Sequence, residues 1–155
     1  MNRIDQLLKE LKLEPHPEGG FFKETFRSAL MVNSPAVAAE RNAVTDIYYL
    51  LTQGDISKLH QVMHDEIWHF YEGDTLELVV FDPIRDDLHR YELGGKDSMD
   101  YKRVVPSGCW QAARSLGEYS LMGCTVAPGF DFMDFAFLND EDFQKELLQK
   151  DESLK

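Results

Sequence analysis

The segment of residues 54–73 restricts the fold of this chain more than any other part of the sequence. It reads as two strands joined by a turn, with His60 in the first strand and Glu66, Trp68 and Phe70 in the second. Side chains two residues apart lie on one face of a strand, so the last three side chains share a face. A carboxylate that begins a stripe of aromatic rings is expected to point with them into the protein interior.

His60 and Glu66 are therefore the first candidates for a functional pair. If His60 points to the same face from the neighbouring strand, an imidazole and a carboxylate meet within an apolar wall. This pairing suits a metal site or an acid–base site. The alternative is a hydrogen-bonded pair in the core that binds no ligand, and the spacing leaves both interpretations open.

Short strand-like runs divided by turns continue through most of the chain. Strands of this length with regular turns are typical of an all-β sandwich or barrel, and the double-sheet jelly roll is one such fold. The predicted strands are residues 21–27, 44–51, 57–62, 66–72, 76–82, 88–93, 101–105, 109–115, 119–127 and 130–138.

Two helices and a loop accompany these strands. Residues 3–12 place apolar side chains at helical spacing after the capping residue Asn2, which predicts a helix. Asn139 precedes an acidic first turn in the tail, which predicts a second, short helix. Residues 29–42 have no clear period and are predicted to form a long loop.

The length of 155 residues favours one domain, and no linker divides the chain. We expect a single domain over residues 1–155. Within it, the N-terminal helix belongs to residues 1–14, the barrel to residues 19–138 and the helical tail to residues 139–155.

Composition excludes several kinds of partner. Sixteen basic and 28 acidic residues give a formal charge of −12, which argues against a nucleic-acid partner because such binding depends on Lys and Arg. No apolar run approaches the ~20 residues of a membrane span, and charges interrupt the N-terminal segment where a signal peptide would need an apolar core. We therefore expect no membrane association and a cytoplasmic location. Cys109 and Cys124 are expected to be reduced thiols, although a bond between them stays open.

The spacing within residues 54–73 resembles the first motif of the cupins. That motif has Gly, five residues, His, one residue, His, three or four residues, Glu, six residues and Gly. Gly54, His60, Glu66 and Gly73 match it, whereas Val62 stands at the position of the second His.

The second cupin motif, Pro-x-Gly followed by a His three residues later, is matched in part. Pro106 and Gly108 are present, and Gln111 stands where the His would be. A narrower resemblance, to the cupin-5 family that is also catalogued as DUF985, covers nearly the whole chain. The segments that carry it are PHPEGGFFKETFRS (15–28), TDIYYLL (45–51), DEIWHFYEGD (65–74), VVPSGCWQAARS (104–115) and GCTVAPGFDF (123–132).

The resemblance implies a cupin-type double-stranded β-helix, or jelly roll, with a small-molecule site inside the barrel. By analogy of fold it implies a small polar ligand, such as a sugar or nucleotide-sugar, and a metal-independent epimerase or isomerase. His60 would be the base of such an enzyme and Glu66 would orient it. Gln111 or Tyr49 would polarise the substrate. The alternatives are a non-catalytic or storage-like binding cupin and a weak metal-dependent enzyme. The other candidate ligand-binding residues are Trp68, Phe70, Glu24, Arg27 and Phe132.

Metal and assembly complete the expectations. A metallocupin site needs three His and a carboxylate, and here His60 and Glu66 remain with Gln111, a poor donor for such metals. We expect no tightly bound metal, and at most a weak divalent site at these residues.

His16 and Glu18 precede a strand that lines the barrel mouth in this family, but the glycines after them have a local turn explanation. Exposed strand edges and the apolar outer positions Ile67, Tyr71 and Val80 favour a homodimer.

Overall fold

The computed structural model describes residues 1–96, 98–134 and 136–137. It has one α-helix, α1 (Arg3–Glu10), and one 3-10 helix, η1 (Phe132–Asp134), in this part of the chain. The strands are β1 (Glu14–Pro15), β2 (Phe21–Arg27), β3 (Met31–Ser34), β4 (Ala39–Asn42), β5 (Thr45–Thr52), β6 (Ile56–Gln61), β7 (Asp65–Gly73), β8 (Leu76–Asp82), β9 (Asp87–Leu93), β10 (Lys102–Val105), β11 (Trp110–Ser115), β12 (Tyr119–Ala127) and β13 (Ala136–Phe137).

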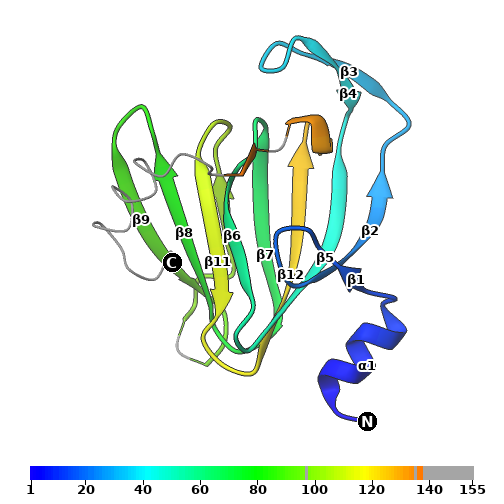
Figure 1. Cartoon of the computed structure of the whole chain (residues 1–155), viewed down its shortest axis with the longest axis vertical. Coiled ribbons are helices and arrows are strands. Elements are labelled where there is room, and N and C mark those ends of the chain that lie inside the picture. The colour runs from blue at the N-terminus through cyan, green and yellow to red at the C-terminus, as the bar shows by residue number, and fades with distance from the viewer. Residues whose placement is uncertain (97, 135, 138–155) are drawn as a thin grey trace.

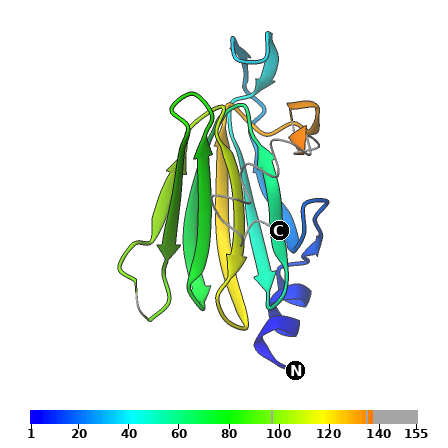
Figure 2. The same cartoon turned by 60° about the vertical axis from the view of Figure 1, so that its left-hand side comes forward.

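Two antiparallel sheets form the barrel (Figure 1). One has six strands in the order β1-β2-β5-β12-β7-β10, and the other has five in the order β13-β6-β11-β8-β9. The hairpin β3-β4 projects from one end, above η1, and α1 lies near the opposite end (Figure 1, Figure 2). The predicted all-β jelly roll with an N-terminal helix is confirmed, and the predicted tail helix at residues 139–155 lies outside the described residues.

Strand β5 shows how the alternation of side chains builds the core. Tyr49 and Leu51 point between the two sheets, where Trp68 of β7 is also buried. Leu50 points to the opposite face of β5, where Leu7 of α1 covers it. Full burial of one leucine side chain contributes about 1.5–3 kcal/mol, so the helix stabilises the six-stranded sheet from outside.

The N-terminal helix begins where the sequence predicted it. The side chain of Asn2 accepts a hydrogen bond from the backbone N–H of Asp5 at 2.8 Å, which satisfies one free donor of the first turn. The helix ends at Glu10, two residues earlier than predicted. No helix in the described part of the chain has the length and apolar character that crossing a membrane requires. Cys109 and Cys124 are both buried, free thiols.

The predicted loop at residues 29–42 is wrong, because this segment forms the hairpin β3-β4, in which Val32 pairs with Arg41. Three of the four residues of β3 are exposed, including Met31 and Val32. A hairpin without a buried face needs no alternation of apolar and polar residues, so these residues show no strand pattern.

The predicted strand at residues 130–138 is also wrong over its first half. The side chain of Asp131 accepts a hydrogen bond from the backbone N–H of Met133 at 2.9 Å, and this local turn leads into η1. Only β13 pairs with β6 among the described residues of this segment. Val80, predicted on the outer face, is instead buried in the core because it shares a face of β8 with Leu78.

Candidate functional site

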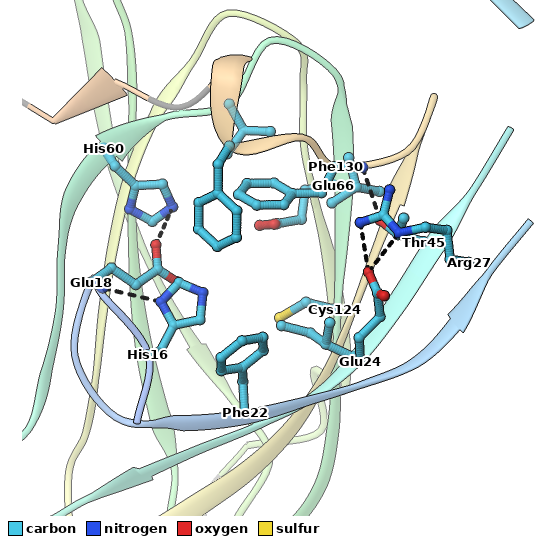
Figure 3. Close-up of a pocket in the computed structure, with 14 residues that line it drawn as sticks. His16, Glu18, Phe22, Glu24, Arg27, Thr45, His60, Glu66, Cys124 and Phe130 are labelled. Atoms are coloured by element: carbon cyan, nitrogen blue, oxygen red, sulfur yellow. Dashed lines mark hydrogen bonds and ion pairs between the residues drawn. The ribbon is translucent and has the colours of Figure 1, made fainter. Parts of the chain in front are cut away.

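A pocket opens inside the barrel, near η1 (Figure 3). About 550 Å³ of space not filled by atoms lies within it, with its open mouth included. Figure 3 shows His16, Glu18 and His60 on one side and Glu24 and Arg27 on the other. The remaining lining residues are Phe22, Thr45, Ile47, Val62, Glu66, Cys124, Val126, Phe130 and Phe132.

Glu18 reaches this pocket through a turn that only glycine permits. Gly19 has a φ of +111°, and a Cβ atom there would lie 2.1 Å from the carbonyl oxygen of Ile56. The turn therefore packs directly against β6, where the backbone N–H of Lys58 donates to the carbonyl oxygen of Glu18 at 2.9 Å. This approach places the Glu18 carboxylate next to the strand that carries His60.

His60 and Glu18 form a buried ion pair. The Nε2 atom of His60 lies 3.0 Å from Oε2 of Glu18, an oxygen that has no well-aligned hydrogen bond in the structure. The Nδ1 atom of His60 lies 2.6 Å from the carbonyl oxygen of Lys58. A carbonyl oxygen only accepts, so Nδ1 carries a proton. A neutral ring would then turn a lone pair on Nε2 toward the carboxylate, whereas an imidazolium directs a second N–H to it.

One further contact tests this charge assignment. The amide nitrogen of Gln111 lies 3.2 Å from Nε2 of His60, and only a neutral His60 could accept a hydrogen bond there. Hydrogen bonds between ionised groups are about twice as strong as those between neutral groups. The carboxylate of Glu18, which lies closer to Nε2 than the amide does, favours the charged ring.

The ionisation of the pair follows from this geometry. Burial alone would lower the pKa of His60, but the carboxylate of Glu18 outweighs burial and raises the pKa to about 9. Burial would raise the pKa of Glu18, and the charge of His60 more than offsets it, so that pKa is lowered. At neutral pH both residues are ionised, and the net charge of the pair is close to zero.

Glu66 is the group in this wall that changes charge near neutral pH. It is buried, and burial raises the pKa of its carboxyl to about 7 against the opposing charge of His60. Its Oε2 atom accepts a hydrogen bond of 2.6 Å from the amide nitrogen of Gln111. The carbonyl oxygen of Gln111 accepts in turn from the indole N–H of Trp68 at 2.8 Å. Trp68 thereby fixes which end of the amide faces the site.

These donors do not fit the metal that many cupins hold. Gln111 turns its NH₂ group, which is no metal ligand, toward His60 and Glu66, because its oxygen is bound to Trp68. Val62 lines the pocket without a donor atom. No group of three or more His, Cys, Asp or Glu side chains suited to a metal ion occurs in the described residues.

The other predicted site residues divide into two groups. Glu24, Arg27 and Phe132 line the pocket together with His60 and Glu66. Tyr49, Trp68, Phe70 and Gln111 do not line it. Tyr49 donates its hydroxyl to the carbonyl oxygen of Gly19 at 2.5 Å, and Phe70 packs against the core cluster between the sheets.

The mouth of the pocket is held by two arginines. Arg27 contacts Oε1 of Glu24 with two of its nitrogens, at 2.6 and 3.1 Å. Arg41 of β4 binds both carboxylate oxygens of Asp134, at 2.6 and 2.8 Å, and so ties η1 to the hairpin. Both contacts are consistent with the salt bridges that are the common role of surface arginines.

Sequence analysis did not place Glu18 beside His60. The two residues are far apart in the chain, and the segment Pro-His-Pro-Glu-Gly-Gly was explained by its local turn. The signal that could have found the pair is the combination of that turn with two glycines, because such a turn lets a side chain approach a neighbouring strand closely.

Comparisons with known proteins agree with this fold. The model of a family described as Cupin superfamily (DUF985) matches residues 5–138. The uncharacterized protein YML079W of Saccharomyces cerevisiae is 32% identical, over 94% of this chain and 80% of its own length.

Solved structures give the same result. A hypothetical protein from Leishmania major has a TM-score of 0.86 at 32% identity and covers 99% of this chain and 96% of its own. Protein SO0799 from Shewanella oneidensis has a TM-score of 0.79 at 33% identity, covering 96% and 90%. Oxalate decarboxylase of Bacillus subtilis shares the fold, with a TM-score of 0.59 at 17% identity over 91% of this chain and 34% of the enzyme.

Proposed function

The chain belongs to the Cupin superfamily (DUF985) family, and we propose that it binds a small molecule inside the barrel and moves a proton on it without a metal, as an isomerase or epimerase does. The observation that carries this proposal is the buried series Glu18–His60–Gln111–Glu66, in which each member contacts the next at 2.6–3.2 Å. Glu18, His60 and Glu66 of this series line the pocket, and Gln111 joins His60 to Glu66 without lining it.

Glu66 is the proton acceptor in this proposal. General bases work best when their pKa is close to the working pH, and burial raises the pKa of Glu66 to about 7. The carboxylate removes a proton from the carbon next to a carbonyl group. The electron pair of the broken C–H bond forms the C=C bond of an enolate, and the carbonyl electrons move onto oxygen. Return of a proton from Glu66 to the same carbon regenerates the substrate. Delivery of a proton from solvent to the opposite face of that carbon gives the epimer, after which Glu66 releases its proton to solvent, and no oxidant is consumed.

His60 supplies positive charge to this step. The sequence assigned it the role of base, but its ion pair with Glu18 keeps the ring protonated at neutral pH. The imidazolium offsets the negative charge that develops on the ligand. Gln111, bound between Trp68 and Glu66, orients the carboxylate.

Hydrogen exchange from solvent tests the proposal. Small carbonyl compounds, sugars and nucleotide-sugars are incubated with the protein in D₂O, and incorporation of deuterium at the carbon next to the carbonyl is followed by NMR. We expect exchange with the wild type and a loss of at least about 100-fold in Glu66→Gln, because a positioned base contributes about 10²–10⁴-fold.

The control variant is Glu77→Gln, which alters a buried carboxylate on β8 that pairs with Arg90 and Arg114, outside the pocket. It should exchange as the wild type does. Binding of a compound in the pocket without any exchange would contradict the catalytic proposal and favour the non-catalytic binding protein.

A further inference from the structure

His16 is an ionisable side chain of the pocket that the proposed proton transfer does not use. Its side chain is only 6% exposed. The ring meets Phe22 edge-on, with ring centres 4.6 Å apart, and lies 5.4 Å from the ring of Tyr49. These two rings restrict its rotation, so the direction of its nitrogens is set by packing.

The structure determines which nitrogen of His16 carries the proton. The backbone N–H of Glu18 donates to Nδ1 of His16 at 3.0 Å. A backbone N–H can only donate, so Nδ1 is an acceptor and the proton of the neutral ring lies on Nε2. A second proton on Nδ1 would face that N–H. Burial lowers the pKa of His16 despite the carboxylate of Glu18, which agrees with a neutral ring.

The Nε2–H group of His16 is directed into the pocket. Figure 3 shows this nitrogen on the side of the ring that faces away from Glu18, toward the space between His60 and Phe22. No acceptor for it is present among the residues that the structure describes. A donor that faces the pocket without a protein partner is available to a ligand.

The rest of the lining defines what kind of ligand fits this donor. Of the rings that line the pocket, Phe22 lies 4.6 Å and Phe132 lies 6.4 Å from His16 between ring centres, and Ile47, Val62 and Val126 add aliphatic lining. Tyr49 and Gln111, which the sequence suggested as polarising groups, bind Gly19 and Glu66 instead. The charged lining groups are already paired, Glu18 with His60, Glu66 with Gln111 and Glu24 with Arg27. A polyhydroxylated compound would therefore find few free partners for its hydroxyl groups.

We propose that His16 donates its Nε2–H to the carbonyl oxygen of the ligand, and that the ligand is a small, mainly apolar carbonyl compound. The identification of that oxygen as the reacting one rests on the proposed function. A neutral imidazole holds the oxygen by a hydrogen bond as negative charge develops on it, and keeps its own proton. The proton that leaves carbon goes to Glu66, and the same proton or one from solvent returns to carbon.

A pair of probes of equal shape tests this. Acetophenone and α-methylstyrene differ only in having C=O or C=CH₂, and binding of both is measured by NMR titration of the whole protein. We expect the preference for the ketone to fall about three- to ten-fold in His16→Phe, the range of one hydrogen bond. His16→Gln retains an N–H donor and should recover part of the preference for the ketone. His89→Phe, at an exposed position on β9, should leave the preference unchanged.

A measurement on the wild type makes the test independent of the folding of these variants. In ¹⁵N spectra at pH 7, His16 should show the neutral form with the proton on Nε2, and the Nε2 signal should shift when acetophenone binds. An imidazolium, a proton on Nδ1, an unchanged preference in His16→Phe, or no binding of acetophenone to the wild type would each overturn the proposal.

The outcome is separable from that of the proposed function. A ketone preference that depends on His16, without any exchange in D₂O, refutes catalysis and leaves His16 as the donor to the ligand. Exchange that depends on Glu66, with no effect of His16→Phe on the preference, refutes the role of His16 and leaves catalysis in place.

Discussion

The Nε2 atom of His60 lies 3.0 Å from the Oε2 atom of Glu18, in a wall of the barrel that water barely reaches. Breaking a buried ion pair by removal of one partner typically costs about 3–5 kcal/mol, because the other charge remains without compensation. The pair therefore links the N-terminal turn to β6 and also sets the charge of the pocket.

The first prediction concerns stability and pH. Glu66 has a pKa raised from 4.5 to about 7, and His60 has one raised from 6.5 to about 9. In both cases the folded state binds the proton more tightly than the unfolded state, so the stabilisation is complete below the unfolded pKa and is lost as pH rises through the folded pKa. We expect the free energy of unfolding in urea to fall between pH 5 and pH 9, by on the order of 3 kcal/mol for each group.

The variant Glu66→Gln separates the two contributions. In this variant the free energy of unfolding should no longer fall below pH 7, but it should still fall between pH 7 and pH 9. Stability that rises over this range in the wild type would contradict the assignment of both groups.

The second prediction concerns Gln111, which is fully buried. Gln111→Leu leaves the indole N–H of Trp68 and the carboxylate of Glu66 without their partner, and an unsatisfied buried group costs about 1–3 kcal/mol. We expect the free energy of unfolding, measured in urea, to fall by that amount for each group. The pKa of Glu66, measured by ¹³C NMR, should be higher.

The matched control is Gln61→Leu on the neighbouring strand β6. Its amide donates to the carbonyl oxygen of Gly108 outside the wall of ionisable groups, so the pKa of Glu66 should not change. Equal effects of both variants on that pKa would show that Gln111 does not orient the carboxylate.

A third prediction compares two aromatic residues on β7. Trp68 is 1% exposed, and truncation of a buried aromatic side chain costs about 3–5 kcal/mol, so Trp68→Ala should unfold or severely weaken the domain. Tyr71 is 50% exposed, and Tyr71→Ala should cost less than about 1 kcal/mol. Thermal and urea unfolding measure both, and a small loss for Trp68→Ala would place this ring outside the core.

The fourth prediction concerns metal. Of the positions that match the cupin metal motifs, only His60 supplies an imidazole, Gln111 presents its NH₂ group and Val62 has no donor, so the pocket should hold little metal. Elemental analysis of protein purified without chelator or added metal should give sub-stoichiometric zinc, iron and manganese. Near-stoichiometric metal that is lost in His60→Ala would establish a metalloenzyme instead.

The fifth prediction concerns assembly. Ile67 and Val104 pair across β7 and β10, and Val104 and Tyr71 are about half exposed. We expect a homodimer that buries this face, and Val104→Lys should dissociate it in sedimentation experiments. Ile84→Lys, at a fully exposed turn, should not. Sedimentation of the wild type as a monomer at tens of micromolar would contradict the expected homodimer.

Local periodicity was sufficient to predict which way β7 faces. Glu66 and Trp68 point inward as their spacing of two residues requires, and both are buried. The hairpin β3-β4 could not be predicted in this way, because Met31 and Val32 are exposed and no buried face imposes a pattern on them.

Which side chains of the site contact each other depends on residues that are distant in the chain, and the spacing of residues in the sequence does not show such contacts. The sequence and its family resemblance identified His60, Glu66 and Gln111, but not the charge of His60, because that charge depends on Glu18 in another turn. In the same way the sequence marked Gln111 as a donor to a ligand, while its amide is bound to Trp68 and Glu66.

The ion pair between Arg41 and Asp134 has a consequence for how the pocket is completed. Glu18 comes near the beginning of the described chain, and Phe130 and Phe132 come near its end, yet all three line one cavity. Arg41 holds the late segment against the hairpin. After a cut between residues 127 and 130, the segment with Phe130 and Phe132 would thus stay in place only through contacts such as this ion pair, and bound ligand should protect that bond from cleavage.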